Sequence, residues 1–334
     1  MKLATLKDGT RDGKLVVVSR DLTHAVSAER IAPTLQAALD DWARVESPLR
    51  ALSDQLHAGT AQGAFPFAAC QAAAPLPRAY QWVDASAFLH HGELMERAYN
   101  LTVEKEPGLP IMYQGAGDDF LGPCDDYPLR SEEDLGDFEG EVAVVLDDVP
   151  LGVTPEEAAS HIKLLVLLND MSLRAHLFQE INVGFGPIRA KPTTSFAPVA
   201  VTPDELGEAW RDGRVQLPLR VEWNGVPFGK PNGQEMNFSF PELIMHLART
   251  RNLRAGTVLG SGTFSNREHQ TVGSACLSER RAIELIELGE ARTRFLRFGD
   301  RLRFEMLNPQ GESVFGAIEQ QIVPVSSAAQ PVTR

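Results

Sequence analysis

The sequence of 334 residues predicts a β-rich α+β fold with short helices at the rim of its sheet. Alternating polar and apolar residues in RAIELIEL (281–288) and GDRLRFEML (299–307) are typical of antiparallel strands with one wet face. Strand-like runs recur between well-marked helix starts, in which Thr or Ser precedes Pro and Glu. No internal repeat or low-complexity tract is visible, so the pattern indicates a mixed globular architecture.

The first part of the chain, residues 1–75, is predicted to form a small α+β domain. Short strands are expected at Leu3–Leu6 and Leu15–Val18, around a turn that contains Gly, and a helical stretch is expected at Pro33–Leu56. The segment AAAPLPRAY follows and is interpreted as a linker because Ala and Pro dominate it.

The larger domain is expected over residues 76–325, before a frayed tail at 326–334. Its helices are predicted to begin after Thr154, Thr202 and Ser239, where a capping residue is followed by Pro and Glu. The strands predicted between these helices are 141–146, 217–223, 257–259, 282–288 and 301–306.

The charge balance argues against a nucleic-acid partner. The chain has 45 acidic and 32 basic residues and a formal net charge of -13, whereas phosphate binding needs a basic surface. No run of eighteen apolar residues is present and the beginning does not resemble a signal peptide. We therefore expect a cytoplasmic protein with no membrane partner.

The three cysteines, Cys70, Cys124 and Cys276, are far apart in the sequence and odd in number. Their spacing matches neither a zinc site nor a disulfide framework. They are expected to be buried or unpaired thiols in a reducing compartment.

Three acidic residues carry the strongest chemical signal. In an extended strand, Glu139 and Glu141 of DFEGEVAVVLDD would present their carboxylates on one face. Asp170 lies two residues after the apolar run 164–168, where an unpaired charge would be costly. Clustered carboxylates without Cys or His suit Mg²⁺ or Ca²⁺ rather than zinc. Alternatively, the two Glu residues lie on a solvated strand face and Asp170 caps the next helix.

Three further residues could serve a ligand, each with a structural alternative. Arg174 lies four residues after Asp170, so on a helix it would share a face with that carboxylate or reach an anionic ligand. Lys191 lies in a stretch rich in Gly, Pro and hydroxyl residues, which is also typical of a surface loop. Thr263 follows a Gly-Ser-Gly turn that could equally be chosen for its positive φ angles.

The adjacent histidines His90 and His91 lie seven residues or fewer after Asp84. One loop could therefore present a metal ligand and a proton acceptor together. A surface or satisfied core histidine is the ordinary alternative, and the spacing alone does not decide between them.

A resemblance to the fumarylacetoacetate hydrolase family is carried by five segments in the family's order: EGEVAVVL, LLVLLNDMSLR, AKPTTSFAP, VEWNGVPF and QEMNFSFPELIMHLARTRNLRAGTVLGSGTFSN. It covers roughly residues 80–320. The most specific parts are the E-x-E strand, the N-D-x-S-x-R segment and the L-x-x-G-T-x-L-x-S-G-T stretch. The resemblance implies a β-roll-like catalytic domain and a homodimer.

The resemblance also implies the roles of site residues. By position, the carboxylates that would hold Mg²⁺ or Ca²⁺ are Asp84, Glu139, Glu141 and Asp170. His91 would be the general base, and Lys191 would support a developing enolate or oxyanion. The residues that fall on substrate-binding positions are Tyr113, Arg174 and Thr263.

The chain departs from the family pattern at four positions. A Tyr early in the Asp84 loop is replaced by Ser86, and a second substrate-binding Tyr falls on Asn182. A substrate-binding Gln of the family aligns with Leu177 or Phe178, which leaves Gln179 as the nearest glutamine. The acidic partner of the catalytic histidine aligns with Leu277, and Glu279 would share its face only if the segment is a strand. These differences bear on the substrate and leave the metal set intact.

The resemblance implies hydrolysis of a carbon–carbon bond in a β-diketone acid, with fumarylacetoacetate as the expected substrate and fumarate and acetoacetate as products. The alternative within the family is an acylpyruvate hydrolase or an oxaloacetate-type β-keto-acid decarboxylase. A different class of protein, a metal-stabilised binding protein without turnover, would use the same carboxylates structurally.

Overall fold

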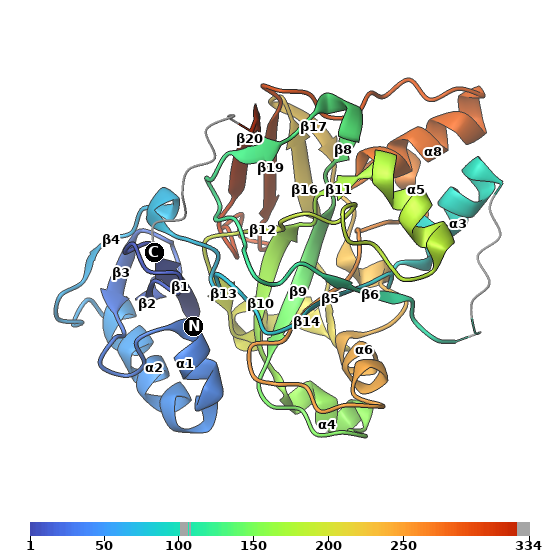
Figure 1. Ribbon diagram of the computed structural model, residues 1–334. Coiled ribbons are helices and arrows are strands. Elements are labelled where there is room, and N and C mark those ends of the chain that lie inside the picture. Colours follow the sequence, from blue (N-terminus) through green and yellow to red (C-terminus); the bar gives the residue numbers. More distant parts are fainter. Residues whose placement is uncertain (101–105, 107, 326–334) are drawn as a thin grey trace.

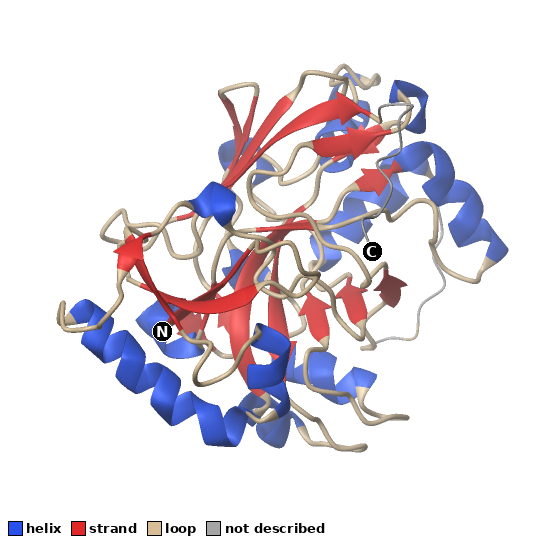
Figure 2. Cartoon of the chain, turned by 60° about the vertical axis from the view of Figure 1, so that its left-hand side comes forward, coloured by secondary structure: helices blue, strands red, loops and turns tan. Residues whose placement is uncertain are grey.

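The computed structural model describes residues 1–100, 106 and 108–325 (Figure 1). The predicted tail, residues 326–334, lies outside the described residues. Two main sheets and several short helices confirm the predicted β-rich α+β class. Figure 2 shows strands through the middle of the molecule and helices mainly at its periphery.

The larger sheet has eleven strands, ten of them in the spatial order β4-β3-β2-β1-β13-β10-β9-β18-β5-β6, and β12 pairs with β10. In that order they are β4 (Phe65–Pro66), β3 (His24–Ser27), β2 (Lys14–Val18), β1 (Lys2–Leu6), β13 (Ala200–Val201), β10 (Ile162–Asn169), β9 (Gly140–Leu146), β18 (Val258–Gly260), β5 (Trp82–Ala85), β6 (Met112–Gly115) and β12 (Ser195–Phe196). Most neighbours are antiparallel, whereas β18 and β5 run parallel.

The centre of this sheet is the antiparallel pair β9 and β10, which is buried on both faces. Every residue of β9 is buried, and its side chains divide between two hydrophobic cores, with Val142 and Val144 in one and Ala143 and Val145 in the other. A strand covered on both sides needs a continuous apolar run, which is what the sequence VAVVL supplies. The two strands therefore form a rigid base from which the adjoining carboxylates project.

The second sheet has the order β17-β16-β19-β20-β7 and covers one face of the central pair. Its strands are β17 (Val226–Gly229), β16 (Leu219–Trp223), β19 (Arg301–Met306), β20 (Ile318–Pro324) and β7 (Tyr127–Leu129). Leu302, Phe304 and Met306 are buried, and the intervening residues of β19 are partly or fully exposed. This alternation confirms the wet-faced strand predicted from GDRLRFEML.

The first seventy residues extend the larger sheet and cover it with α1 (Leu35–Asp40) and α2 (Trp42–His57) (Figure 1). Val45 and Leu49 of α2 share a hydrophobic core with Leu3 and Leu15 of the strands. Strand β1 pairs with β13 of the larger segment, so hydrogen bonds of one sheet cross the predicted domain boundary. The boundary at residues 75/76 stays a prediction.

The remaining helices are α3 (Leu89–Tyr99), α4 (Pro155–Ser160), α5 (Arg174–Val183), α6 (Phe240–Leu247), α7 (His269–Val272) and α8 (Leu277–Leu288). Thr154 and Ser239 form the predicted capping boxes of α4 and α6. Thr202 instead precedes a 3₁₀ segment, Pro203–Ala209, without a side-chain cap bond.

The predicted strand at residues 282–288 is wrong, because these residues belong to helix α8. The Glu, Leu and Ile residues of this segment also fit a helix, and the cap residue Gly289 ends it in the left-handed conformation at φ 79. Ala282 and Ile283 pack against Leu94 of α3, and the two helices lie side by side (Figure 1). Packing against α3 therefore determines that this segment is a helix, because its apolar positions alone fit both a helix and a strand.

The expectation of unpaired cysteines is wrong for two of the three. Cys70 and Cys124 form a disulfide with a Cα–Cα distance of 5.1 Å across 54 residues of sequence. Cys276 is free and buried. The disulfide removes the unpaired cysteines as a reason for expecting a reducing compartment, and the compartment stays a prediction.

In the part of the chain that is described, no helix has the length and apolar character to span a membrane.

Candidate active site

Three carboxylates meet where neighbouring strands of the larger sheet end. Asp84 lies in β5, Glu141 in β9, and Asp170 directly follows β10. One oxygen of each carboxylate lies within 4.8 Å of the others, and all three side chains are buried. The structure thus brings together three of the four predicted metal ligands.

The turn after β18 closes this cluster from one side. The backbone N–H of Gly262 donates to Oδ1 of Asp84 at 3.0 Å and to Oε2 of Glu141 at 3.1 Å. Gly262 has φ +78, and a Cβ there would meet the carbonyl oxygen of Ala85 at 2.2 Å. The sequence left open whether this turn served chemistry or a positive φ, and Gly262 does both.

Glu139, the fourth predicted ligand, directly precedes β9 and lies beside the cluster. Its backbone N–H donates to Oδ1 of Asn169 at 3.0 Å, and its carbonyl accepts from the N–H of Asp170 at 2.9 Å. Glu139 is 5% exposed and Glu141 0%. The alternative of a solvated strand face is therefore wrong for both residues.

Lys191 links two of the acidic residues. Its Nζ lies 2.6 Å from Oε2 of Glu139 and 2.7 Å from Oδ2 of Asp170. The ammonium also lies 5.0 Å from the ring centroid of Tyr113. Lys191 is 6% exposed, so the surface-loop alternative is wrong.

Asp170 accepts bonds from side chains rather than from a helix N-terminus. The hydroxyl of Thr194 donates to its Oδ1 at 2.8 Å, and the hydroxyl of Tyr113 donates to Oδ2. The helix-cap alternative is therefore wrong. Tyr113, predicted as a substrate contact, lies in β6, which pairs with β5 so that Tyr113 is opposite Asp84.

Arg174 does not pair with Asp170, because a short strand, Ser172–Leu173, separates that residue from α5. Its guanidinium instead contacts Glu139 and lies 2.8 Å from Oδ2 of Asp137. The expected shared helix face is wrong. Arg174 therefore holds Glu139 in place rather than Asp170, the predicted metal ligand that precedes it by four residues.

Asp137 is a site residue that the sequence analysis missed. It is fully buried and accepts from the backbone N–H groups of Leu277 at 2.7 Å and Ser278 at 2.9 Å. It thereby anchors the N-terminus of α8 next to Arg174, a favourable position for an anion. Its place two residues before Glu139, on the same alternating face, was the available signal.

A histidine–carboxylate pair adjoins the cluster. Nδ1 of His91 on α3 lies 2.9 Å from Oε2 of Glu279 on α8. Glu279 is fully buried, whereas 17% of the His91 side chain is exposed. A ring nitrogen of His91 also lies within 4.8 Å of a Glu139 oxygen. Glu279 thus reaches His91 from a helix, although a strand was the predicted condition for that contact.

The last two predicted substrate residues lie in different surroundings. Thr263 is 6% exposed and directly follows Gly262. Gln179 is exposed on α5 and accepts from Nη2 of Arg189 at 3.2 Å. Among the described residues, no hydrogen bond joins Gln179 to the carboxylate cluster.

Burial and like charges shift the proton affinities of the cluster. Burial, reinforced by Asp170, raises the pKa of Asp84 to about 7. Burial and the neighbouring Asp84 raise the pKa of Glu141 well above its usual range. Burial would also raise the pKa of Glu139, but Lys191 and Arg174 outweigh it and hold that pKa far below its usual range. Negative charge is thus compensated at Glu139 and uncompensated at Asp84 and Glu141.

The residues present fit a divalent cation. Oε1 of Glu141 is buried and has no hydrogen-bond partner, although an isolated buried carboxylate oxygen is costly. Asp84 and Asp170 offer further oxygens within 4.8 Å. An all-oxygen donor set suits a hard ion such as Mg²⁺, Ca²⁺ or Mn²⁺.

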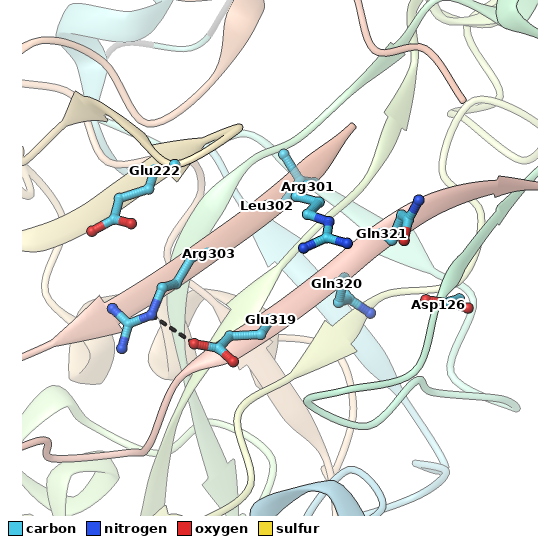
Figure 3. A pocket seen from close by; sticks show the side chains of 9 residues that line it. Asp126, Glu222, Arg301, Leu302, Arg303, Glu319, Gln320 and Gln321 are labelled. Atoms are coloured by element: carbon cyan, nitrogen blue, oxygen red, sulfur yellow. Dashed lines mark hydrogen bonds and ion pairs between the residues drawn. The ribbon is translucent and has the colours of Figure 1, made fainter. Parts of the chain in front are cut away.

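Two surface cavities lie away from the cluster. One, of about 380 Å³, is on the outer face of the second sheet and is lined by Arg301, Arg303 and Glu319 among others (Figure 3). Another, of about 800 Å³, includes His90 and Arg267 in its lining. None of the predicted site residues lines either cavity.

Comparison with known proteins identifies the family to which this chain belongs. The family described as "Fumarylacetoacetate (FAA) hydrolase C-terminal" matches residues 81–323, and "Fumarylacetoacetase N-terminal domain 2" matches residues 1–78. The chain belongs to the fumarylacetoacetate hydrolase family. The resemblance recognised from the sequence motifs is thereby confirmed.

Curated relatives catalyse different reactions. The chain is 30% identical over 160 residues to 2,4-didehydro-3-deoxy-L-rhamnonate hydrolase of Sphingomonas sp. (strain SKA58), covering 47% of this chain and 53% of that protein. It is 31% identical over 204 residues to a fumarylacetoacetase of Aspergillus fumigatus, covering 52% and 46%. An oxaloacetate tautomerase of Bacillus subtilis is 30% identical over 141 residues, covering 41% and 44%. The chain thus spans about half the length of these relatives.

Solved structures share the fold. Maleylpyruvate hydrolase from Sphingobium sp. SYK-6, in complex with manganese(II) and pyruvate, aligns with a TM-score of 0.64 at 15% identity, covering 97% of this chain and 99% of that one. At this identity the likeness establishes the architecture and leaves the substrate open.

Proposed function

We propose that this protein hydrolyses a carbon–carbon bond in a β-diketone acid, with fumarylacetoacetate as the substrate and fumarate and acetoacetate as products. The observation that supports this most directly is the His91–Glu279 pair, 2.9 Å apart, beside a buried carboxylate cluster. Hydrolysis needs an activated water next to a group that stabilises the departing carbanion. A binding protein or a purely structural metal site needs no such base.

His91 serves as the general base in this proposal. Because Nδ1 of His91 faces Glu279, Nε2 is the nitrogen left for a water molecule. Proton transfer to Nε2 makes an imidazolium, which the Glu279 carboxylate stabilises and holds in orientation. A positioned base of this kind contributes about 10²–10⁴-fold to the rate.

The divalent cation, Mg²⁺ or Ca²⁺, would be held by Asp84, Glu139, Glu141 and Asp170. When bound, it supplies Lewis-acid stabilisation of negative charge on the diketone oxygens. The chain holds the four carboxylates ready through the N–H of Gly262, the Thr194 hydroxyl and the Lys191 ammonium. Both ions take oxygen ligands, and resupplying each in turn distinguishes them.

Lys191 is the proposed donor to the developing enolate or oxyanion. Two of its three N–H bonds point to Glu139 and Asp170, which leaves one for substrate. Burial lowers the pKa of Lys191, but Asp170 and Glu139 raise it by more. The pKa therefore lies above its usual range and the amine stays protonated. Arg174, Tyr113, Thr263 and Gln179 are proposed to orient the carboxylate and carbonyl oxygens of the substrate.

An acylpyruvate hydrolase or an oxaloacetate-type decarboxylase is the alternative reaction. It is favoured by the similarity to an oxaloacetate tautomerase and by the shared architecture of a maleylpyruvate hydrolase. These substrates also form enolates, and a divalent cation held by the same carboxylates would stabilise that negative charge. Detection of CO₂ as product, rather than acetoacetate and fumarate, would identify decarboxylation.

The test uses protein stripped with a chelator and resupplied with Mg²⁺ or Ca²⁺. Loss of the enol-diketone ultraviolet absorbance of fumarylacetoacetate, with fumarate formed, is the expected result. If neither ion restores turnover of fumarylacetoacetate while an acylpyruvate or oxaloacetate is consumed, the proposed substrate is rejected and the alternative holds.

We further propose a cytoplasmic homodimer that acts in tyrosine or aromatic catabolism. Exposed apolar side chains on and after α5 support the dimer: Phe178, Ile181, Val183, Phe185 and Ile188 are all more than half exposed. The catabolic role rests on the proposed substrate and shares its test.

A further inference from the structure

A second group of possible metal ligands lies beside the all-carboxylate cluster. One ring nitrogen of His91, one oxygen of Glu139 and Sγ of Cys276 lie within 4.8 Å of one another. Glu139 and Cys276 are buried, and His91 is partly open to solvent. The group therefore has two buried members and one, His91, that solvent reaches in part.

The donor atoms of this group differ in chemistry from those of the carboxylate cluster. One nitrogen, one sulfur and one oxygen are the ligand types that Zn²⁺ takes, and three protein ligands leave a fourth position open. Mg²⁺ and Ca²⁺ are hard ions that prefer oxygen and gain little from a thiolate. The second group thus favours a different cation, although it shares Glu139 with the proposed Mg²⁺ or Ca²⁺ site.

The surroundings of Cys276 favour a cation. The Cys276 sulfur lies within 4.8 Å of a ring nitrogen of His91 and of a Glu139 oxygen, and it accepts from the backbone N–H of Glu279 at 3.3 Å. Oε1 of Glu279 is fully buried and has no hydrogen-bond partner. An unpaired carboxylate oxygen next to this group is an independent sign that a cation can be accommodated.

We propose that His91, Glu139 and Cys276 bind a thiophilic divalent cation, Zn²⁺, and that this ion inhibits the enzyme by occupying its base. On binding, the S–H bond of Cys276 breaks, the proton leaves to solvent, and the sulfur lone pair forms the Zn–S bond. His91 then has a nitrogen committed to the metal instead of to water. The inhibition rests on the proposed role of His91, whereas the binding does not.

The binding test uses full-length protein saturated with Mg²⁺, so that the carboxylate cluster is filled before Zn²⁺ or the spectroscopic substitute Co²⁺ is added. The wild-type protein is expected to bind one additional ion per chain, measured by equilibrium dialysis. With Co²⁺ it should show a thiolate-to-cobalt charge-transfer band in the near ultraviolet. Cys276 is the free cysteine, since Cys70 and Cys124 are joined in a disulfide, so the band reports this site.

The matched variant is Cys276→Ser. Sγ of Cys276 accepts from the backbone N–H of Glu279 at 3.3 Å and so caps α8. Serine is a better capping residue and retains that bond, while it removes the soft donor. The variant should keep Mg²⁺-supported turnover, lose the cobalt band, and bind Zn²⁺ more than about 10-fold less tightly, because loss of a direct ligand exceeds the effect of losing a supporting contact.

Unchanged Zn²⁺ affinity in Cys276→Ser, or equal inhibition of both proteins by Zn²⁺, would overturn the proposal and place the ion in the carboxylate cluster. His91→Ala is the second variant, and it should weaken Zn²⁺ binding while the cobalt band persists in reduced form. If the wild-type protein turns over no dicarbonyl acid yet shows the band, the zinc site stands and the proposed function fails.

Discussion

At the scale of single residues, His91 is the side chain on which the proposed chemistry depends most. His91→Ala removes the base but none of the four carboxylates, so we expect turnover to fall by about 10²–10⁴-fold while Mg²⁺ or Ca²⁺ binding is retained. Initial rates and isothermal titration with the metal measure the two effects separately. Loss of metal binding together with turnover would remove His91 from the role of base.

Lys2 offers a pH-dependent stability test far from the active site. It is 4% exposed, and its Nζ donates to the carbonyl oxygens of Ser313 at 2.9 Å and Val314 at 2.7 Å. Burial is the main cause that lowers the pKa of Lys2 from 10.5 to about 8. Between these two pH values the unfolded chain binds more protons at this residue than the folded chain, so the free energy of unfolding rises with pH.

The expected difference follows from comparing the wild type with Lys2→Met. The wild type should gain about 3 kcal/mol of stability relative to the variant as the pH rises from about 8 to 10.5. Urea unfolding at the two ends of this range measures it. Lys14→Met, at an exposed position of β2, is the control and should show no such trend. A constant difference between wild type and Lys2→Met would show that Lys2 keeps its ordinary proton affinity.

The carboxylates show how much of the candidate site can be predicted from residue patterns in the sequence. Glu139, Glu141 and Asp170 were predictable as a group because the two-residue period of a strand and a buried apolar run fix where charges emerge. Asp137 has the same spacing, but its partners, the N–H groups of Leu277 and Ser278, come from a helix 140 residues later. Contacts between elements so distant in sequence leave no local signature.

At the scale of elements, the same limit explains two of the wrong predictions, the strand at 282–288 and the unpaired cysteines. The segment 282–288 fits both a strand and a helix by its apolar positions, and packing on α3 decided the outcome. The pairing of Cys70 with Cys124 depends on the fold bringing a 3₁₀ turn, Ala69–Gln71, to the loop after β6. The capped helices α4 and α6 were predictable because their signals lie within four residues.

The disulfide should contribute measurable stability because it closes a loop of 54 residues. Replacing Cys70 and Cys124 together by Ser is expected to lower the free energy of unfolding by about 2–4 kcal/mol. Urea unfolding with and without a reducing agent measures this. The reduced wild type should match the double variant, and Cys276→Ser, which keeps the disulfide, should lose stability on reduction as the wild type does. Equal stability of oxidised and reduced wild type would mean that the bond restrains nothing in the unfolded chain.

The apolar surface on and after α5 makes the proposed dimer testable. Phe185 is 95% exposed and Ile188 78%, values that suit a covered interface rather than a solvated loop. Phe185→Glu should convert dimers to monomers, as followed by sedimentation velocity. Val226→Glu, at a 64% exposed position on β17, is the control. A monomeric wild type at all accessible concentrations would contradict the proposal.

At the scale of the whole molecule, the architecture concentrates negative charge where the two central strands end. Asp84 and Glu141 come from two strands of one sheet and Asp170 directly follows a third. Lys191 and the turn at Gly262 hold them from two further segments, and Arg174 holds the neighbouring Glu139. The N-cap of α8, the His91–Glu279 pair and Cys276 border the same region. Folding of most of the chain is therefore needed before any part of the site exists.

The pairing of β1 with β13 has a further consequence for how the protein can be divided. A fragment that begins at residue 76 would lose β1 to β4 and leave β13 with unpaired N–H and C=O groups along an open edge. Such an edge recruits strands from other chains. We expect light scattering to show that this fragment self-associates, whereas the full chain stays dispersed. The first seventy residues would then protect the chain from aggregation by covering the edge of β13.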